Sequence, residues 1–359
     1  MKNTRLNALA VIGCCTVLTA CAGKTVDTTP AYPTAVVEAK FSVNGRFVPD
    51  FSGVQTVYTR SDMRSLKQKT EFDSFVMRWL NSDVQDIFRL DKNLVWQVDF
   101  DNETYQECSL TGCISGLDAW NEKMQSSEED DTEDYESYDE LDCKVELVRN
   151  DTEVKATGKT RVISGMEAKE YTLDWITEFQ DTARRKDKST VSFVFWTTDP
   201  DESKESVWRT HREFTEGYLK ATEANDPMIR LLGKEGVRAL SAFTGDIKRT
   251  DAEEFNDFTR SLAKIEGYPL SIKVEWYSET NACQEARAPK STTVSGGSIE
   301  DQAMDVVGGF FSKQAEKLVT GDKTDPNVRY IYEVTSAAEK PIRDSQFAVP
   351  ADFTLQNRQ

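Results

Sequence analysis

The thiol at position 21 is the first side chain in this sequence whose setting predicts a chemical modification. Cys21 directly follows Leu18-Thr19-Ala20, which ends an apolar run that begins at Ala8. A short positive segment containing Lys2 and Arg5 precedes that run. A charged start, a short apolar middle and small residues at the end are typical of a secretory signal peptide. The run is also shorter than the ~20 apolar residues that a membrane-spanning helix needs, so we expect an exported chain.

The sequence Leu18-Thr19-Ala20-Cys21 resembles the lipobox of bacterial lipoproteins. This resemblance implies that residues 1–20 are a lipoprotein signal peptide, that Cys21 is diacylated, and that the new amino terminus is acylated after cleavage. Each buried methylene contributes about 0.8 kcal/mol, so more than one acyl chain makes attachment to the membrane stable. By the enterobacterial sorting rule, Ala22 in place of Asp favours the outer membrane, on its periplasmic side. The lipoprotein-processing and sorting machinery would then be partners of the chain.

The remaining cysteines predict disulfide chemistry. Of seven cysteines, Cys14 and Cys15 leave with the signal, and Cys21 takes lipid. Four stay in the mature chain, namely Cys108, Cys113, Cys143 and Cys283. An even number in an oxidising compartment predicts two disulfides, and three pairings are possible. We favour a short Cys108–Cys113 loop together with Cys143–Cys283, which would join the middle of the chain to its last third.

No residue pattern predicts an enzyme, a metal site or a cofactor. His211 is the only histidine, and it lies on the apolar stripe of a predicted helix over about 201–221. A catalytic histidine needs a nucleophile and an orienting partner, and no G-x-S-x-G, P-loop or G-x-G-x-x-G accompanies it. A zinc site would need paired cysteine spacings with histidine partners. We therefore expect His211 to be a packed core histidine in a non-enzymatic protein.

Charge and low-complexity segments limit the partners. The chain has 359 residues and a formal net charge of −18. We expect so acidic a surface to repel nucleic acid. Residues 21–34 are rich in Thr and Pro and predict a flexible tether. Residues 126–142 hold ten carboxylates and no base, which predicts a disordered acidic insertion. Calcium capture is the alternative, but the segment lacks the glycine and the ligand spacing of an EF-hand loop.

Most of the mature chain shows the period of two residues that is typical of half-buried strands. Val37, Ala39, Phe41 and Val43 alternate with polar residues, for example. Between residues 143 and 163 the pattern predicts three short strands, over 143–148, about 153–157 and 161–163, and Ser164-Gly165 then predicts a turn. Tight turns between such blocks predict an antiparallel sheet. Helical spacing is confined to residues 72–80, 201–221, 227–243, 250–267 and 298–318. The strand over 191–196 is apolar on both faces, so we expect elements to cover both.

Large aromatic residues on these strands and helices have two interpretations. The set comprises Trp96, Phe193, Phe195, Phe214, Phe243, Trp276 and Phe310. They could form an ordinary filled core between sheet and helices, or line a hollow that accepts an acyl chain or a hydrophobic peptide. Both arrangements need the same residue types, so the sequence leaves the choice open.

Three segments behind the lipobox resemble the LolA/LppX-like half-barrel family of periplasmic proteins and lipoproteins. They are residues 157–171, Gly267-Tyr268-Pro269-Leu270, and Phe347-Ala348-Val349-Pro350. The resemblance implies a single α+β domain over residues 35–359, in which a curved antiparallel sheet carries several helices on or in its concave face. It implies a lipid-anchored carrier of hydrophobic cargo such as an acyl chain, a lipid or a lipoprotein. The alternative is a structural or interaction lipoprotein with a filled core, acting in envelope maintenance.

Overall fold

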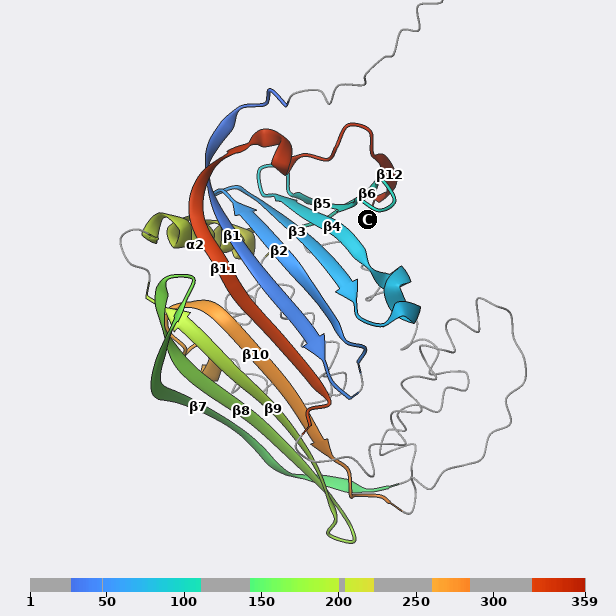
Figure 1. Ribbon diagram of the computed structural model, residues 1–359. Helices are drawn as coiled ribbons and strands as arrows, with labels where there is room; N and C mark the ends of the chain where they lie inside the picture. Colours follow the sequence, from blue (N-terminus) through green and yellow to red (C-terminus); the bar gives the residue numbers. More distant parts are fainter. Residues whose placement is uncertain are drawn as a thin grey trace, which may run out of the picture.

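The structure, a computed structural model, describes residues 27–46, 48–110, 143–199, 204–222, 260–284 and 325–358. Its main feature is one twelve-stranded sheet, shown in Figure 1. The strands are β1 (Ala31–Asn44), β2 (Phe51–Thr59), β3 (Met63–Phe72), β4 (Ser82–Arg89), β5 (Leu94–Asp99), β6 (Thr104–Cys108), β7 (Val145–Ile163), β8 (Met166–Asp181), β9 (Lys186–Thr198), β10 (Tyr268–Glu279), β11 (Val328–Arg343) and β12 (Thr354–Arg358).

The order of the strands places the first described strand, β1, in the middle of the sheet and the last, β12, at its edge. The order is β12-β6-β5-β4-β3-β2-β1-β11-β10-β9-β8-β7. All neighbours are antiparallel except β12 and β6, which are parallel. The pairing of β1 with β11 joins two meanders, β1 to β6 and β7 to β11, into one continuous sheet.

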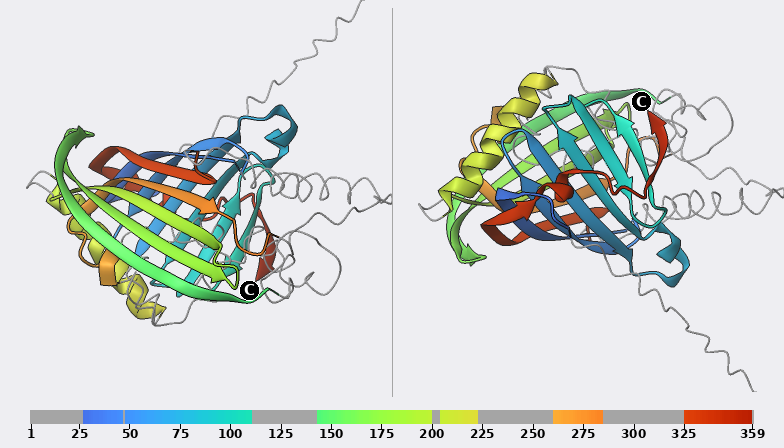
Figure 2. Two further views of the ribbon diagram at one scale, coloured as in Figure 1. Left: turned by 90° about the horizontal axis from the view of Figure 1, so that it is seen from below. Right: turned by 90° about the horizontal axis from the view of Figure 1, so that it is seen from above.

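The sheet bends into a trough. In Figure 1 the edge strands β7 and β12 lie at the two extremes of the sheet. In the views of Figure 2 both edges lie on the same side of the central strands β1 and β11. The sheet therefore has a concave face between its raised edges and a convex face on the other side.

One complete α-helix, two short 3-10 helices and the α-helical residues 260–262, which lie within the helix predicted over 250–267, accompany the sheet in the described residues. Helix α2 (Glu205–Ala221) lies across one end of the concave face, against β1, β2 and β11 (Figures 1 and 2). The 3-10 helix η1 (Phe75–Leu80) follows β3, and η4 (Asp344–Phe347) follows β11. None of the described helices is long and apolar enough to cross a membrane.

The prediction of an α+β fold with several helices is wrong. The described chain is predominantly β, with one large mixed sheet and few helical residues. One reason is that the strands are longer than their apolar blocks suggested. Residues 143–163 were divided into three strands where polar residues interrupt the alternation, yet they contain the single strand β7. An edge strand tolerates polar side chains on both faces, so its backbone ladder continues through them. The helices expected over 227–243 and 298–318 lie outside the described residues.

Both faces of the sheet bury apolar side chains. Ile87 and Phe88 are neighbours on β4, so they point to opposite faces. Phe88 packs on the concave side against Phe214 of α2, with ring centroids 6.4 Å apart. Ile87 packs on the convex side against Phe347 of η4, and both are almost fully buried. The carboxyl-terminal segment thus covers the convex face where α2 covers the concave one.

The tip of the β7–β8 hairpin folds over the sheet and contacts β11. Its turn is Ser164-Gly165, as predicted, with φ angles of 51° and 79°. Arg161 donates to Glu333 on β11 at 2.8 Å, and the Ser164 hydroxyl donates to the carbonyl of Val334 at 2.6 Å. Three strands separate β7 from β11 in the sheet order, so the tip bends across the sheet to reach it. Gly158, at φ 76°, lies within the register irregularity where this bend begins.

The amino-terminal residues that the structure describes are held against the carboxyl-terminal segment. β1 begins at Ala31, so the last residues assigned to the tether lie in the sheet. Asp27 accepts a hydrogen bond from the Ser345 hydroxyl, and Arg343 donates to the carbonyl of Thr29. The hydrogen bonds from Ser345 and then Thr29 lower the pKa of Asp27 to about 2. The predicted acidic insertion, 126–142, lies outside the described residues.

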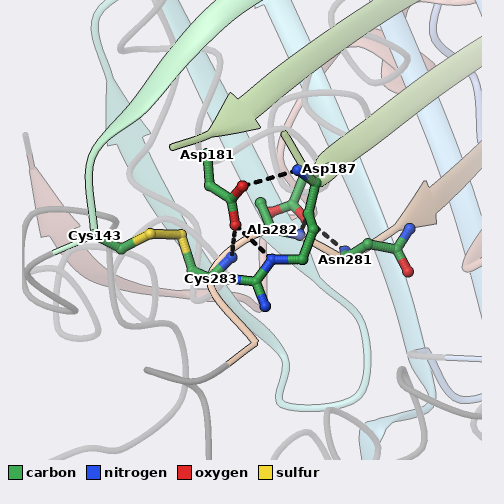
Figure 3. The surroundings of a disulfide bond; sticks show 7 residues. Cys143, Asp181, Asp187, Asn281, Ala282 and Cys283 are labelled. Carbon is green, nitrogen blue, oxygen red and sulfur yellow. Dashed lines mark hydrogen bonds and ion pairs between the residues drawn. A yellow bond between two sulfur atoms is a disulfide. The ribbon is translucent and has the colours of Figure 1, made fainter. Parts of the chain in front are cut away.

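The predicted Cys143–Cys283 disulfide is confirmed. It joins Cys143, two residues before β7, to the loop after β10, with a Cα–Cα distance of 6.0 Å and a sequence separation of 140. Figure 3 shows this bond beside the turn that connects β8 and β9. Cys108, at the end of β6, is also disulfide-bonded, and its predicted partner Cys113 lies outside the described residues.

Two buried carboxylates fix the backbone of the loop that carries Cys283. Asp187 accepts from the backbone N–H groups of Asn281 and Ala282, both at 2.7 Å. Asp181 accepts from the N–H of Cys283 at 3.0 Å (Figure 3). The loop turns through a left-handed conformation at Cys283, with φ 57°. Side-chain acceptors thus replace the strand pairing that the loop has left.

Candidate functional site

The most unusual chemistry in the described chain gathers around Arg64 on the concave face. Arg64 pairs with Phe88 in the β3–β4 ladder and with Thr59 in the β2–β3 ladder, so its side chain points toward α2. Its guanidinium carbon lies 4.1 Å from the ring centroid of Phe214. A cation over an aromatic face is attracted by the ring quadrupole, which compensates part of the lost hydration.

Arg64 makes its hydrogen bonds to neutral acceptors. Its Nε donates to the Thr59 hydroxyl at 3.3 Å, and its Nη2 lies 3.2 Å from Nδ1 of His211. No ion pair joins Arg64 to a carboxylate within the described ranges. Burial lowers the pKa of Arg64 to about 10, so the residue remains a cation at neutral pH. A positive charge in a partly buried, largely aromatic setting is costly unless an anion accompanies it.

The contact with Arg64 determines the tautomer of His211. Arginine only donates hydrogen bonds, so Nδ1 of His211 must accept, and the proton of the neutral ring is on Nε2. Burial and then the charge of Arg64 hold the pKa of His211 well below its usual range. His211 is 6% exposed, as its position on the apolar stripe predicted. His211 is therefore a neutral imidazole whose hydrogen-bond donor is Nε2.

Two buried donors of this cluster make no hydrogen bond within the part of the chain that the structure describes. They are Nε2 of His211 and Nε1 of Trp208, one turn earlier on α2. The Trp208 side chain is 1% exposed, and its ring stacks on Tyr268 of β10 with centroids 4.1 Å apart. Leaving a buried donor unpaired costs about 1–3 kcal/mol. Together with Arg64, the cluster is rich in donors and poor in acceptors.

Two tyrosines complete the surroundings of Arg64. Burial raises the pKa of Tyr268 to about 12, and it also raises the pKa of Tyr332 on β11. Both hydroxyls therefore stay protonated at neutral pH and add no negative charge. We call the five residues Arg64, Trp208, His211, Tyr268 and Tyr332 the arginine cluster.

The predicted aromatic set divides over two faces of the sheet. Phe193 and Phe195 on β9 are fully buried and stack with centroids 5.8 Å apart, and Trp276 packs beside them. Phe214 belongs to a separate cluster under α2. Trp96 pairs with Ile87, so it lies on the convex side with the carboxyl-terminal segment. Trp96 is therefore not part of a concave hollow, because the parity of β5 directs it to the other face.

The other predicted positions are Phe243 and Phe310, which lie outside the described residues, as does Cys21. No group of three or more potential metal ligands occurs in the described chain.

Sequence reasoning missed Arg64. Strand 63–72 is polar along most of its length, so periodicity gave no reason to place one of its cations toward the core. The packing of β3 between β2 and β4, under α2, decides that orientation. The sequence predicted the burial of His211 from its position on the apolar stripe of the helix, but it gave no sign of the contact with Arg64.

The chain matches no known protein family in the comparisons made with it. No protein-family model matches its sequence. A search of curated proteins likewise gives no match.

Proposed function

We propose that this chain is a lipid-anchored, non-enzymatic binding module that holds an apolar ligand on the concave face of its sheet. Anchoring through Cys21 would place it at the periplasmic side of the outer membrane. The observation that carries the proposal is the shape and lining of the sheet. The sheet forms a trough with a helix across one end, and β9 contributes large aromatic side chains to its concave side, the kind of apolar lining that an acyl chain needs (Figure 2).

The arginine cluster supports binding over catalysis. A general base or nucleophile would need an accessible pKa near neutrality and a reacting partner. His211 has a strongly lowered pKa, and its Nδ1 is occupied by Arg64. The polar groups of the concave face are therefore suited to holding a ligand in one orientation within an apolar site.

One observation favours a second candidate function, a structural lipoprotein with a filled core. Leu173, Phe193 and Phe195 on the concave face have no exposed surface. Complete burial is what a packed interior requires, and such a protein would act in the envelope through contacts between proteins. The two candidates differ in whether an apolar molecule can enter beside these residues.

Native mass spectrometry separates the two candidates. The mature chain with Cys21→Ser would be exported behind a signal that needs no lipidation, purified without detergent, and extracted with organic solvent. A bound mass that is released as lipid is the expected result. A clean mass of the protein alone, with no uptake of added fatty acid or phospholipid, would contradict ligand binding and favour the filled core.

The anchor has its own test. Metabolic labelling with radioactive palmitate should label the wild-type protein in a bacterial host and leave Cys21→Ser unlabelled. Cys14→Ser and Cys15→Ser are matched controls, since these cysteines lie in the predicted signal peptide, and both should keep the label. Equal labelling of Cys21→Ser would exclude Cys21 as the acylated residue.

A further inference from the structure

We infer that the arginine cluster binds the anionic headgroup of the apolar ligand, and that the ligand is a lipid ending in a carboxylate or phosphate. This inference rests on the proposed function, because it assigns the polar end of the molecule whose chain occupies the trough. It follows from three donor groups in one compact cluster: a guanidinium whose charge no described carboxylate neutralises, and two buried N–H groups for which no described residue is an acceptor.

The first donor is the Arg64 guanidinium. Its contacts in the described chain are the Thr59 hydroxyl, His211 and the ring of Phe214, all of them neutral. Arg60, four residues earlier, has a different environment, since its Nη1 donates to Asp344 at 2.6 Å. The chain therefore provides a carboxylate for one inward arginine and none, among the described residues, for the other.

The second and third donors are the N–H groups of Trp208 and His211. Both side chains are more than nine-tenths buried, and neither N–H has an acceptor in the described ranges. The two rings lie 6.0 Å apart between centroids, and both approach Tyr268. A tryptophan N–H can only donate, so an acceptor has to come from elsewhere.

An anionic headgroup has the matching chemistry. A carboxylate or phosphate presents several acceptor oxygens and one or more negative charges, and its hydrogen bonds with a guanidinium are about twice as strong as neutral ones. Tyr332 of the cluster pairs with Ile272 on β10, which in turn pairs with Phe195 on β9, so a row of apolar side chains leads from the cluster toward Phe195 and Phe193. With the headgroup bound at Arg64, the alkyl chain of the lipid would extend along β10 and β9 toward Phe195 and Phe193.

The test compares two probes with the same alkyl chain, oleate and oleyl alcohol, titrated into the mature Cys21→Ser protein. Charge-assisted hydrogen bonds contribute about 1.5–3 kcal/mol, so wild type should bind oleate at least about tenfold more tightly than the alcohol. In Arg64→Gln this preference should disappear while the affinity for the alcohol stays the same. Arg209→Gln is the matched control, because Arg209 lies on the exposed side of α2 and should keep the preference.

A second variant protects the test against misfolding of Arg64→Gln. Trp208→Phe keeps the buried ring and removes the unpaired N–H, so it should weaken oleate binding about tenfold and leave the alcohol unaffected. Equal binding of oleate and oleyl alcohol by wild type would overturn the headgroup assignment and leave the proposed function standing. Binding of neither probe would overturn the proposed function itself.

Inorganic phosphate without an alkyl chain distinguishes a lipid headgroup from a free anion. We expect it to bind at least about a hundredfold more weakly than oleate, because the chain contributes most of the apolar contact. Phosphate that binds as tightly as oleate, with loss of binding in Arg64→Gln, would overturn the lipid assignment and identify a free anion as the ligand.

Discussion

Arg64 Nη2 lies 3.2 Å from Nδ1 of His211, a contact between β3 and α2 across 147 positions of the sequence. The only histidine of the chain is thereby held neutral against a guanidinium that stays protonated at neutral pH. Protonation of His211 would place two positive charges in contact inside an aromatic cluster. The folded state therefore resists protonation at this position.

This contact makes folding stability depend on pH. The unfolded imidazole titrates near pH 6.5, whereas burial and the charge of Arg64 hold the pKa of folded His211 well below that value. Below pH ~6.5 the unfolded chain binds a proton that the folded chain does not. The contribution of His211 to the free energy of unfolding should be fully present above that pH. Below it, the free energy of unfolding should fall by about 1.4 kcal/mol per pH unit until the pH reaches the pKa of folded His211.

Urea denaturation of the wild type between pH 7.5 and 5, values chosen around the histidine pKa, measures this effect. Carboxylates with lowered pKa values, such as Asp27 at about 2, lose their stabilising effect only below the unfolded carboxyl pKa of ~4, so they do not disturb this window. In His211→Asn the asparagine can still accept a hydrogen bond from Arg64, and it does not titrate. The free energy of unfolding of this variant should therefore not change with pH over the same range. A flat wild-type profile would contradict the lowered pKa of His211.

The Cys143–Cys283 disulfide should contribute strongly to stability. It closes a loop of 140 residues between the β7 edge and the loop after β10. The chain-entropy model gives about 5 kcal/mol for such a loop. We expect the double variant Cys143→Ser/Cys283→Ser to lose about 2–5 kcal/mol in urea denaturation. Non-reducing peptide mapping of the wild type should recover the two cysteines as one linked peptide, and free thiols at both positions would contradict the pairing.

Asp187 should matter for the conformation of the loop before Cys283. Asp187→Ala removes the acceptor of two backbone N–H groups, those of Asn281 and Ala282, and should cost about 2 kcal/mol. Hydrogen exchange at these two amides should accelerate, because they lose their protection. Asp187→Asn retains one acceptor oxygen and is the graded control, with a smaller change expected at both amides. Unchanged exchange in Asp187→Ala would show that water satisfies the loop equally well.

The packing of Phe193 on the concave face can be tested by a substitution that leaves a cavity. Phe193 is fully buried and packs beside Phe195 and Leu173, so Phe193→Ala should destabilise the protein by about 3–5 kcal/mol. Val162→Ala is a suitable control, because Val162, on β7 of the same sheet, is 72% exposed and should change stability by less than about 0.5 kcal/mol. Similar stabilities for both variants would mean that Phe193 is not packed as the structure shows.

Local patterns predicted much of the sheet and one helix. The alternation of Val37, Ala39, Phe41 and Val43 identified β1, and the turn Ser164-Gly165 was placed correctly between β7 and β8. The stripe that includes His211 identified α2. These features succeed because side-chain periodicity and turn chemistry are set by neighbours only a few positions away. The same approach divided β7 into pieces, since polar residues in an edge strand look like interruptions.

The sequence alone predicted the strands with clear alternation, helix α2 and the Cys143–Cys283 pairing. The pairing of β1 with β11, the predominantly β fold and the orientation of Trp96 away from Phe214 became evident only in the folded chain. The same is true of the contact between Arg64 and His211. The physical reason is that burial and unpaired donors depend on contacts between distant segments, and no local spacing encodes which strand or helix will lie opposite a given side chain.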